Sequence, residues 1–156
     1  MNLNSTEWRQ IFKSAKQICR ENKLKEFHYK FLQRIIVTKK ELCRFGIKKD
    51  SDCLYCGKED SMEHTSINCQ FSKAFQRRVI QWFNNVNYTN QHPSVKETLF
   101  GLFPTSITNK PLLRKLNYTL LYTRYYIYTS KVHNRSITLS DSVTKLITKY
   151  NVENIN

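Results

Sequence analysis

Hydrophobic side chains recur every three or four residues along most of this 156-residue chain, with polar side chains between them. That spacing is typical of amphipathic α-helices, because it places the hydrophobic side chains on one face. The segments with this pattern are residues 5–19, 24–36, 39–45, 71–83, 95–100, 112–132 and 140–150. Strand is an alternative near 122–130, where β-branched and aromatic residues gather, but the segment's length and leucine spacing favour helix. We therefore expect an all-α protein.

Some of these segments begin and end at residues that favour helix termini. Asn4 with Glu7, and Thr38 with Glu41, have the spacing of a capping box, in which two side chains satisfy backbone amides of the first helical turn. Gly46 suits the left-handed conformation that ends many helices. These signals predict a helix that begins near residue 5 and a short one between residues 38 and 46.

Breaks between the segments divide the chain. Residues 84–93 are polar and rich in asparagine, and we interpret them as the principal loop and a boundary between lobes. Gly101, Pro104 and Pro111 interrupt the pattern again, and Pro111 suits the first position of the long helix that follows. We expect one small helical domain, or two helical lobes around a zinc knuckle. The parts would be N-terminal basic amphipathic helices at 1–46, the knuckle at 47–70 and a C-terminal helical region at 71–156.

The central part contains four residues that commonly bind zinc. Cys53, Cys56, His64 and Cys69 follow the spacing C-x2-C-x7-H-x4-C, and Gly57 directly after the second cysteine allows a tight turn around an ion. Four protein ligands complete the tetrahedral coordination of Zn2+ and leave no position for water. We therefore predict a structural Cys3His site with Zn2+ as its cofactor.

The surrounding sequence favours a metal over the alternatives. Ser61 is suited to start a short helical turn that carries His64. Few apolar side chains lie between residues 53 and 69, too few to order the segment without a metal. Core cysteines and disulfides are the alternatives, but an odd number of cysteines and no preceding secretory signal argue against complete disulfide pairing. Cys19 and Cys43 lie in apolar stretches, and we interpret both as packing residues.

The balance of charge points to a polyanionic partner. Lysine and arginine number 26 against 12 aspartate and glutamate residues, which gives a formal net charge of +14. Such an excess repels itself in a compact fold and is neutralised by nucleic acid or by an acidic membrane surface. The most apolar run, residues 112–132, carries Arg114, Lys115, Arg124 and Lys131, which would be costly at membrane depth. We therefore predict a nucleic-acid partner and no membrane.

Basic residues that would contact phosphates fall into three groups. On the first segment they recur at steps of four, three and four residues and form a stripe of their own, with no acidic residues between them. Others flank the predicted metal site or follow it. The candidates are Arg9, Lys13, Lys16, Arg20, Lys48, Lys49, Lys58, Arg77 and Arg78. A solvated helix face is the alternative for any such row, and Lys58 has a second one, because lysines near a Cys3His zinc site can balance its net negative charge.

Taken together, these features resemble a known family. The residues that carry the likeness are Leu24 to Leu32, Arg34 to Thr38, Leu42, Gly46 and Ile47, the C-x2-C-G turn with His64 and Cys69, then Phe75 and Trp82, and later Leu99 to Leu102 and Leu120 to Lys131. The pattern is similar to the reverse-transcriptase zinc-binding domain, which lies near the C-terminus of the polyproteins of LINE-type (non-LTR) retrotransposons. The resemblance implies that Cys53, Cys56, His64 and Cys69 are the metal ligands. It also implies a role in gripping template RNA or target DNA while a catalytic domain elsewhere copies it.

The chain lacks what the catalytic parts of such a polyprotein need. A polymerase holds catalytic magnesium with clustered carboxylates, and this sequence has no Tyr-x-Asp-Asp motif. Its aspartates are Asp50, Asp52, Asp60 and Asp141. We therefore expect neither polymerase nor endonuclease activity, and we interpret the chain as a C-terminal fragment or remnant of an RNA-directed DNA polymerase polyprotein that begins at an internal methionine.

Two functions remain open. The first is a non-catalytic, zinc-stabilised nucleic-acid-binding module without a small-molecule substrate, in an intracellular and nuclear location inferred from charge and kinship. The second is a protein-interaction scaffold that docks on the polymerase portion of a retrotransposon protein without touching nucleic acid. Exposed aromatic and leucine surface on residues 112–132 would support this second function. A catalytic zinc fits less well. It needs an acid or base, for which Glu59 or Glu63 could serve, and also an open coordination position, but the four protein ligands leave none.

Overall fold

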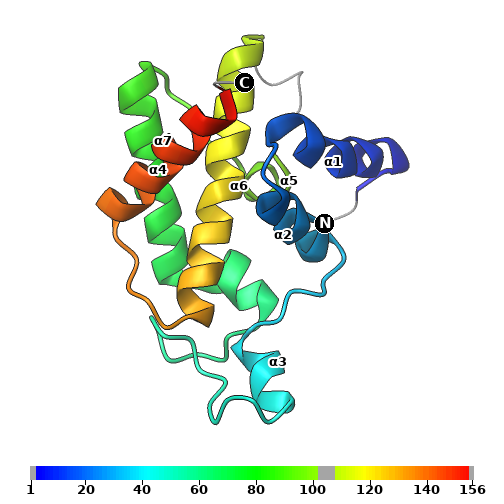
Figure 1. Cartoon of the computed structure of the whole chain (residues 1–156), viewed down its shortest axis with the longest axis vertical. Helices are drawn as coiled ribbons and strands as arrows, with labels where there is room; N and C mark the ends of the chain where they lie inside the picture. Colours follow the sequence, from blue (N-terminus) through cyan, green and yellow to red (C-terminus); the bar gives the residue numbers. More distant parts are fainter. Residues whose placement is uncertain (1–2, 102–107, 155–156) are drawn as a thin grey trace.

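The computed structural model describes residues 3–101 and 108–154, and within them every regular element is a helix (Figure 1). The helices are α1 (Ser5–Ile18), α2 (Asn22–Leu32), α3 (Lys39–Arg44), η1 (His64–Asn68), α4 (Gln70–Asn87), α5 (Val95–Phe100), α6 (Lys110–Val132) and α7 (Leu139–Asn154), where η1 is a π-helical turn. These two stretches contain no β-strand, although an isolated antiparallel bridge joins Asp52 to Glu59. The prediction of an all-α protein is confirmed.

Helix α6 lies at the centre of the fold. Figure 1 shows it running through the middle of the molecule, with α4 on one side and α1 and α2 on the other. It packs against α1, α2, α4, α5, α7 and η1. Its buried residues extend from Leu113 to Lys131 and include unbroken runs that cannot share one face, as expected for a helix that others cover on several sides. The strand alternative for residues 122–130 is therefore wrong.

Helix α6 is rich in threonine, yet it remains helical because the threonine hydroxyls find partners within it. The hydroxyls of Thr119, Thr123 and Thr129 donate to carbonyl oxygens four residues earlier, at 2.9, 2.7 and 2.9 Å. These bonds satisfy polar groups that would be costly to bury alone. None of the helices in the described stretches combines the length and the apolarity that crossing a lipid bilayer requires.

The helix termini predicted from Asn4, Thr38 and Gly46 are confirmed. Asn4 and Glu7 exchange hydrogen bonds of 2.9 and 2.8 Å between backbone and side chain at the start of α1. Thr38 and Glu41 form a second capping box at the start of α3. Gly46 has a φ of 72° and ends α3 with the paired backbone bonds of a Schellman motif. Local side-chain chemistry therefore fixes these boundaries.

Helix α2 ends at Leu32, so the prediction of a helix that continues to residue 36 is wrong. Arg34 adopts a left-handed φ of 56°, and the amides of Arg34 and Ile35 donate to carbonyl oxygens of the last turn at 3.1 and 2.9 Å. Ile35 is consequently 55% exposed, whereas Ile36 reaches the core from an extended segment. The hydrophobic spacing gave no sign of this end, because an arginine occupies the left-handed position that glycine usually takes.

Helix α4 continues into the segment predicted as a loop at residues 84–93, which is a second correction. The loop begins only at Tyr88, which has a φ of 52°. The side chain of Asn84, still helical, bonds to the backbone of Gln91 at both its oxygen and its nitrogen, each at 2.9 Å, and so holds the loop against the helix end. Phe71, predicted to face the core from the first turn of this helix, is 49% exposed.

The start of α6 agrees closely with its sequence signals. Asn109 caps the helix by accepting a hydrogen bond from the amide of Leu112 at 3.1 Å, and Pro111 is the second helical residue rather than the first. The break predicted at Pro104 lies outside the described residues. The division into 1–46, 47–70 and 71–156 stays a prediction.

Helix α7 stabilises the junction between the first two helices. Glu153 is 8% exposed, and its carboxylate accepts hydrogen bonds from the backbone amides of Arg20 and Glu21 at 2.9 and 3.0 Å. These amides lie just before the first turn of α2, where the helix dipole favours a negative charge. The carboxylate therefore links residues more than 130 positions apart in the sequence.

Replacement of Glu153 by glutamine should lower the free energy of unfolding by about 1–3 kcal/mol, because an amide cannot accept both backbone bonds as the charged carboxylate does. Urea denaturation measures the loss. Glu26→Gln is the matched control, since the Glu26 carboxylate is exposed and pairs with Lys30 on the surface of α2, where such pairs contribute little. Equal effects from the two substitutions would contradict the role of Glu153.

Candidate metal centre

Residues 52–59 form a tight turn that brings two cysteines together. The bridge between Asp52 and Glu59 closes the turn. Inside it, the amide of Cys53 donates to the carbonyl of Lys58 at 2.7 Å, and the amide of Gly57 donates to the carbonyl of Cys53 at 2.9 Å. Gly57 has a φ of 71°, which residues with a side chain rarely adopt. The turn predicted at this glycine is confirmed.

The other two ligands flank the π-helical turn η1: His64 is its first residue and Cys69 directly follows its last. The hydroxyl of Ser61 accepts a hydrogen bond from the amide of His64 at 3.1 Å, as predicted for the residue that starts this turn. The amide of Cys69 then donates to the carbonyl of His64 at 2.7 Å. This bond spans five residues, so the wide turn places His64 and Cys69 side by side at the start of α4.

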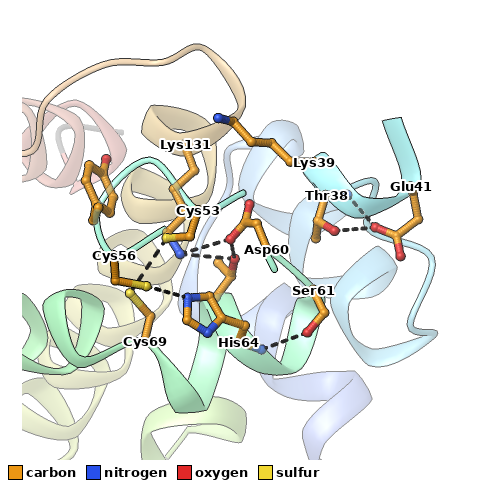
Figure 2. Close-up of polar contacts among 12 residues, drawn as sticks. Thr38, Lys39, Glu41, Cys53, Cys56, Asp60, Ser61, His64, Cys69 and Lys131 are labelled. Carbon is orange, nitrogen blue, oxygen red and sulfur yellow. Dashed lines mark hydrogen bonds and ion pairs between the residues drawn. The ribbon is translucent and has the colours of Figure 1, made fainter. Parts of the chain in front are cut away.

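The Cys3His cluster (Cys53, Cys56, His64 and Cys69) has a geometry that fits a zinc ion (Figure 2). Its four ligand atoms lie within 4.8 Å of one another, and three of the four residues are buried. The sulfur atoms of Cys53 and Cys69 are 3.9 Å apart, and the sulfur of Cys56 is 3.1 Å from Nε2 of His64. Tetrahedral zinc with bonds of about 2.3 Å to sulfur separates two sulfurs by about 3.8 Å. The donor set and its spacing therefore suit Zn2+ without an open position.

The protein environment prepares these ligands for a cation to different degrees. Burial, followed by the charge of Lys131, lowers the pKa of His64, which leaves a neutral imidazole with a free lone pair near pH 7. Burial raises the pKa of the Cys56 thiol. Burial also opposes ionisation of Cys69, but the polar groups of Ser72, the Lys131 charge and the amide of Phe71 together lower the pKa of that thiol. A metal ion would favour all three thiolates.

A buried ion pair lies directly beside the Cys3His cluster. Lys131 reaches from α6 to Asp60, with 3.1 Å between its Nζ and the carboxylate, and both side chains are almost fully buried (Figure 2). The hydroxyl of Thr65 donates to the same carboxylate oxygen at 2.7 Å and lies 3.3 Å from Nζ. The ammonium is also 5.7 Å from the ring centroid of Tyr55. These contacts satisfy two charges that would otherwise be costly to bury.

Lys131 also faces the cysteines. Burial by itself would lower the pKa of Lys131, but Asp60 and then the sulfurs of Cys69 and Cys53 raise it. Lys131 therefore stays charged and offsets negative charge at the Cys3His cluster. The sequence had suggested this role as the alternative for Lys58, which is exposed. Sequence reasoning missed Lys131, and its one signal was a lysine inside the most apolar run of the chain.

The remaining cysteines and acids lie outside the cluster. Cys19 is 1% exposed in the hydrophobic core, as predicted for a packing residue, whereas Cys43 is only half-buried. Glu59 pairs with Lys40 at 2.7 Å, and exposed Glu63 lies 3.9 Å from the guanidinium of Arg34, just past the end of α2. The two glutamates that could have served a catalytic site are thus held by surface cations.

The N-terminal half of the chain, including the Cys3His cluster, matches a known family. The match covers residues 2–75, and the family is described as zinc-binding in reverse transcriptase. This segment is a reverse-transcriptase zinc-binding domain. The zinc-binding domain thus extends from α1 into α4 and contains all four ligands, but not Lys131. No curated protein and no solved structure matches the chain.

The structure places the predicted phosphate-contacting residues in three separate regions. Along α1 and just after it, Arg9, Lys13, Lys16 and Arg20 are exposed. In or near the turn of residues 52–59, Lys49 and Lys58 are exposed and Lys48 is half-buried. On α4, Arg77 and Arg78 are exposed. Figure 1 shows α1 and α4 on opposite sides of α6, and α3 at the far end of the molecule. The ammonium of Lys48 donates to the carbonyl of Val132 at 3.2 Å, so this lysine also caps the end of α6.

The purified chain should contain about one zinc ion per molecule, as expected for a closed tetrahedral site. Cys69→Ser should reduce the zinc content to near zero and lower the melting temperature, because the remaining donors no longer close the site. Elemental analysis and circular dichroism measure these effects. Cys43→Ser is the matched control and should keep both values. A metal-free chain whose melting is unchanged by exhaustive chelation would contradict the assignment.

Replacement of Lys131 by methionine should cost about 3–5 kcal/mol of folding free energy, because it leaves the Asp60 carboxylate buried and unpaired. Adding Asp60→Asn to this variant should recover much of the loss, since both charges are then removed. Chemical denaturation of the zinc-loaded protein compares the original chain with the single and the double variant. Lys110→Met, at the exposed start of the same helix, should have little effect, and a similar loss there would refute the buried ion pair as the cause.

Proposed function

We propose that this chain is a non-catalytic nucleic-acid-binding module, in which a structural zinc ion orders residues 53–69 and basic side chains bind the phosphates of RNA or DNA. The proposal includes an origin in a LINE-type retrotransposon polyprotein and a nuclear location. Three observations support it: the zinc-binding domain, the resemblance of residues 99–102 and 120–131 to LINE-type retrotransposon proteins, and the net charge of +14. Phosphate contacts of this kind give affinity without strong sequence readout.

The observation that carries the proposal is the exposed basic row on α1. Arg9, Lys13 and Lys16 have no ion-pair partner among the described residues. The acidic residue of this helix, Glu7, is instead held by Lys96 at 2.6 Å. The row therefore presents positive charge to solvent without local neutralisation, which is what a phosphate backbone requires.

The contacts of Asp60 and Asp141 support a role without catalysis. Asp60 is buried with Lys131, and Asp141 binds Lys145 and the hydroxyl of Tyr126, each at 2.8 Å. Two-metal catalysis needs carboxylates that converge on one open site. These two are instead engaged by different partners, and the Cys3His cluster has no ligand position left for a substrate.

The scaffold alternative has less support. It required exposed aromatic and leucine surface on residues 112–132, and the large side chains of α6 are mostly buried, among them Leu116, Tyr118 and Leu121. The apolar surface on which a polymerase core would dock is therefore not found on that helix.

A triple substitution of Arg9, Lys13 and Lys16 by glutamine should weaken binding to RNA and DNA at low salt, because it removes charges that bind phosphates. The slope of log affinity against log salt should decrease by about one for each phosphate that the variant no longer neutralises. Filter binding with single-stranded and duplex probes over a salt series measures both quantities.

The matched control removes the same charge from exposed positions elsewhere, at Lys110, Lys115 and Lys145. Its smaller effect would assign the contact to α1 rather than to net charge. Affinity that barely changes with salt in the original protein would rule out a phosphate grip, and tight binding to an isolated polymerase portion instead would favour the scaffold.

A further inference from the structure

Arg124 is a buried cation without an acidic partner. It lies on α6 with 6% of its surface exposed, far less than any residue of the basic row. Its Nη2 lies 3.4 Å from Nδ1 of His28, and its guanidinium packs 5.0 Å from the ring centroid of Phe31. Its Nε and Nη1 have no hydrogen-bond partner among the described residues. None of the carboxylates in the described stretches forms an ion pair with Arg124.

Neither nearby group removes this charge. Burial lowers the pKa of Arg124 to about 9, so the guanidinium is still protonated at neutral pH. Burial and the adjacent Arg124 lower the pKa of His28 to about 3, so the imidazole is neutral: its Nδ1 accepts a hydrogen bond from Arg124 but supplies no negative charge. The ring of Phe31 contributes a weak cation–π attraction. The positive charge inside the fold therefore remains uncompensated.

A small cavity adjoins this side chain. Its volume is about 20 Å3, and it is lined by Arg124, Gln76, Thr65, Ile127 and the rings of α2 and α6. The side-chain nitrogen of Gln76, which projects from α4, has no hydrogen-bond partner among the described residues either. The space holds one or two water-sized species and is too small for the five heavy atoms of a phosphate.

We propose that this cavity binds a single monatomic anion, of the size of chloride, between the Arg124 guanidinium and the Gln76 amide. A water molecule would satisfy hydrogen bonds but would leave the charge uncompensated in an apolar interior, where burying an unpaired charge is most costly. Rotating the Gln76 amide would offer Arg124 an oxygen but no negative charge. The anion would join α4 and α6 next to α2 and to η1, on which Thr65 lies, and its binding would not require nucleic acid.

Bromide provides a direct test on the full zinc-loaded chain. Crystals grown or soaked in sodium bromide should show an anomalous peak within hydrogen-bonding distance of Nε or Nη1 of Arg124. Thermal melting in sodium chloride should occur at a higher temperature than in sodium gluconate of equal ionic strength, because gluconate is too large for the cavity. A cavity that contains only water in bromide, or equal melting temperatures in the two salts, would overturn the proposal.

Two substitutions separate this site from general anion effects on a basic protein. Gln76→Glu places a carboxylate beside the cavity, so the variant should melt at a higher temperature than the original protein in gluconate and lose the difference between the two salts. Gln81→Glu makes the same charge change at an exposed position of the same helix and should keep that difference. Arg124→Met should also lose it, and if that variant does not fold, Gln76→Glu decides. Persistence of the full salt difference in Gln76→Glu would refute the site.

Discussion

The ion pair between Asp60 and Lys131 is the interaction on which the arrangement of this chain depends. It joins a short, weakly apolar metal-binding segment to the most buried helix of the fold, across 71 positions of sequence. Because both side chains are almost fully buried, neither is stable in that place without the other. The same ammonium lies beside the sulfurs of the Cys3His cluster, so the charge of the metal site and the packing of α6 are set together. The metal centre is therefore part of the core rather than an appendage to it.

Sequence predicted those features that depend on neighbours along the chain. The four ligands, the glycine turn between them, both capping boxes and the Schellman end of α3 follow from side-chain chemistry within a few residues. The helical class followed from periodicity, which also located α4, α6 and α7 to within a few residues. Recognition of the zinc-binding domain came from the same local signals, and the family match confirms it for residues 2–75.

The features that sequence did not predict depend on distant residues or on strained backbone. In the sequence, Lys131 stands out only as an unfavourable charge in an apolar helix, because its carboxylate partner, Asp60, lies in another part of the sequence. No residue near Glu153 in the sequence indicates that its carboxylate binds the backbone amides just before α2. Arg34 ends α2 in a conformation that favours glycine and is held there by backbone bonds to the last turn, which no side chain in the sequence signals. The neutral His28 and the unpaired Arg124 likewise become visible only when α2 and α6 are brought together.

The place where the family match stops has a consequence for how this unit can be moved or truncated. Residue 75 lies inside α4, and the lysine that completes the metal environment belongs to α6. A recombinant piece cut at that boundary would lose most of α4 and all of α5, α6 and α7, and with α6 the counter-charge of Asp60, while its four ligands remained intact. The piece would still bind metal through its four ligands but would not fold on its own, so it would behave as a chelating peptide. The smallest independent unit is thus larger than the recognisable motif.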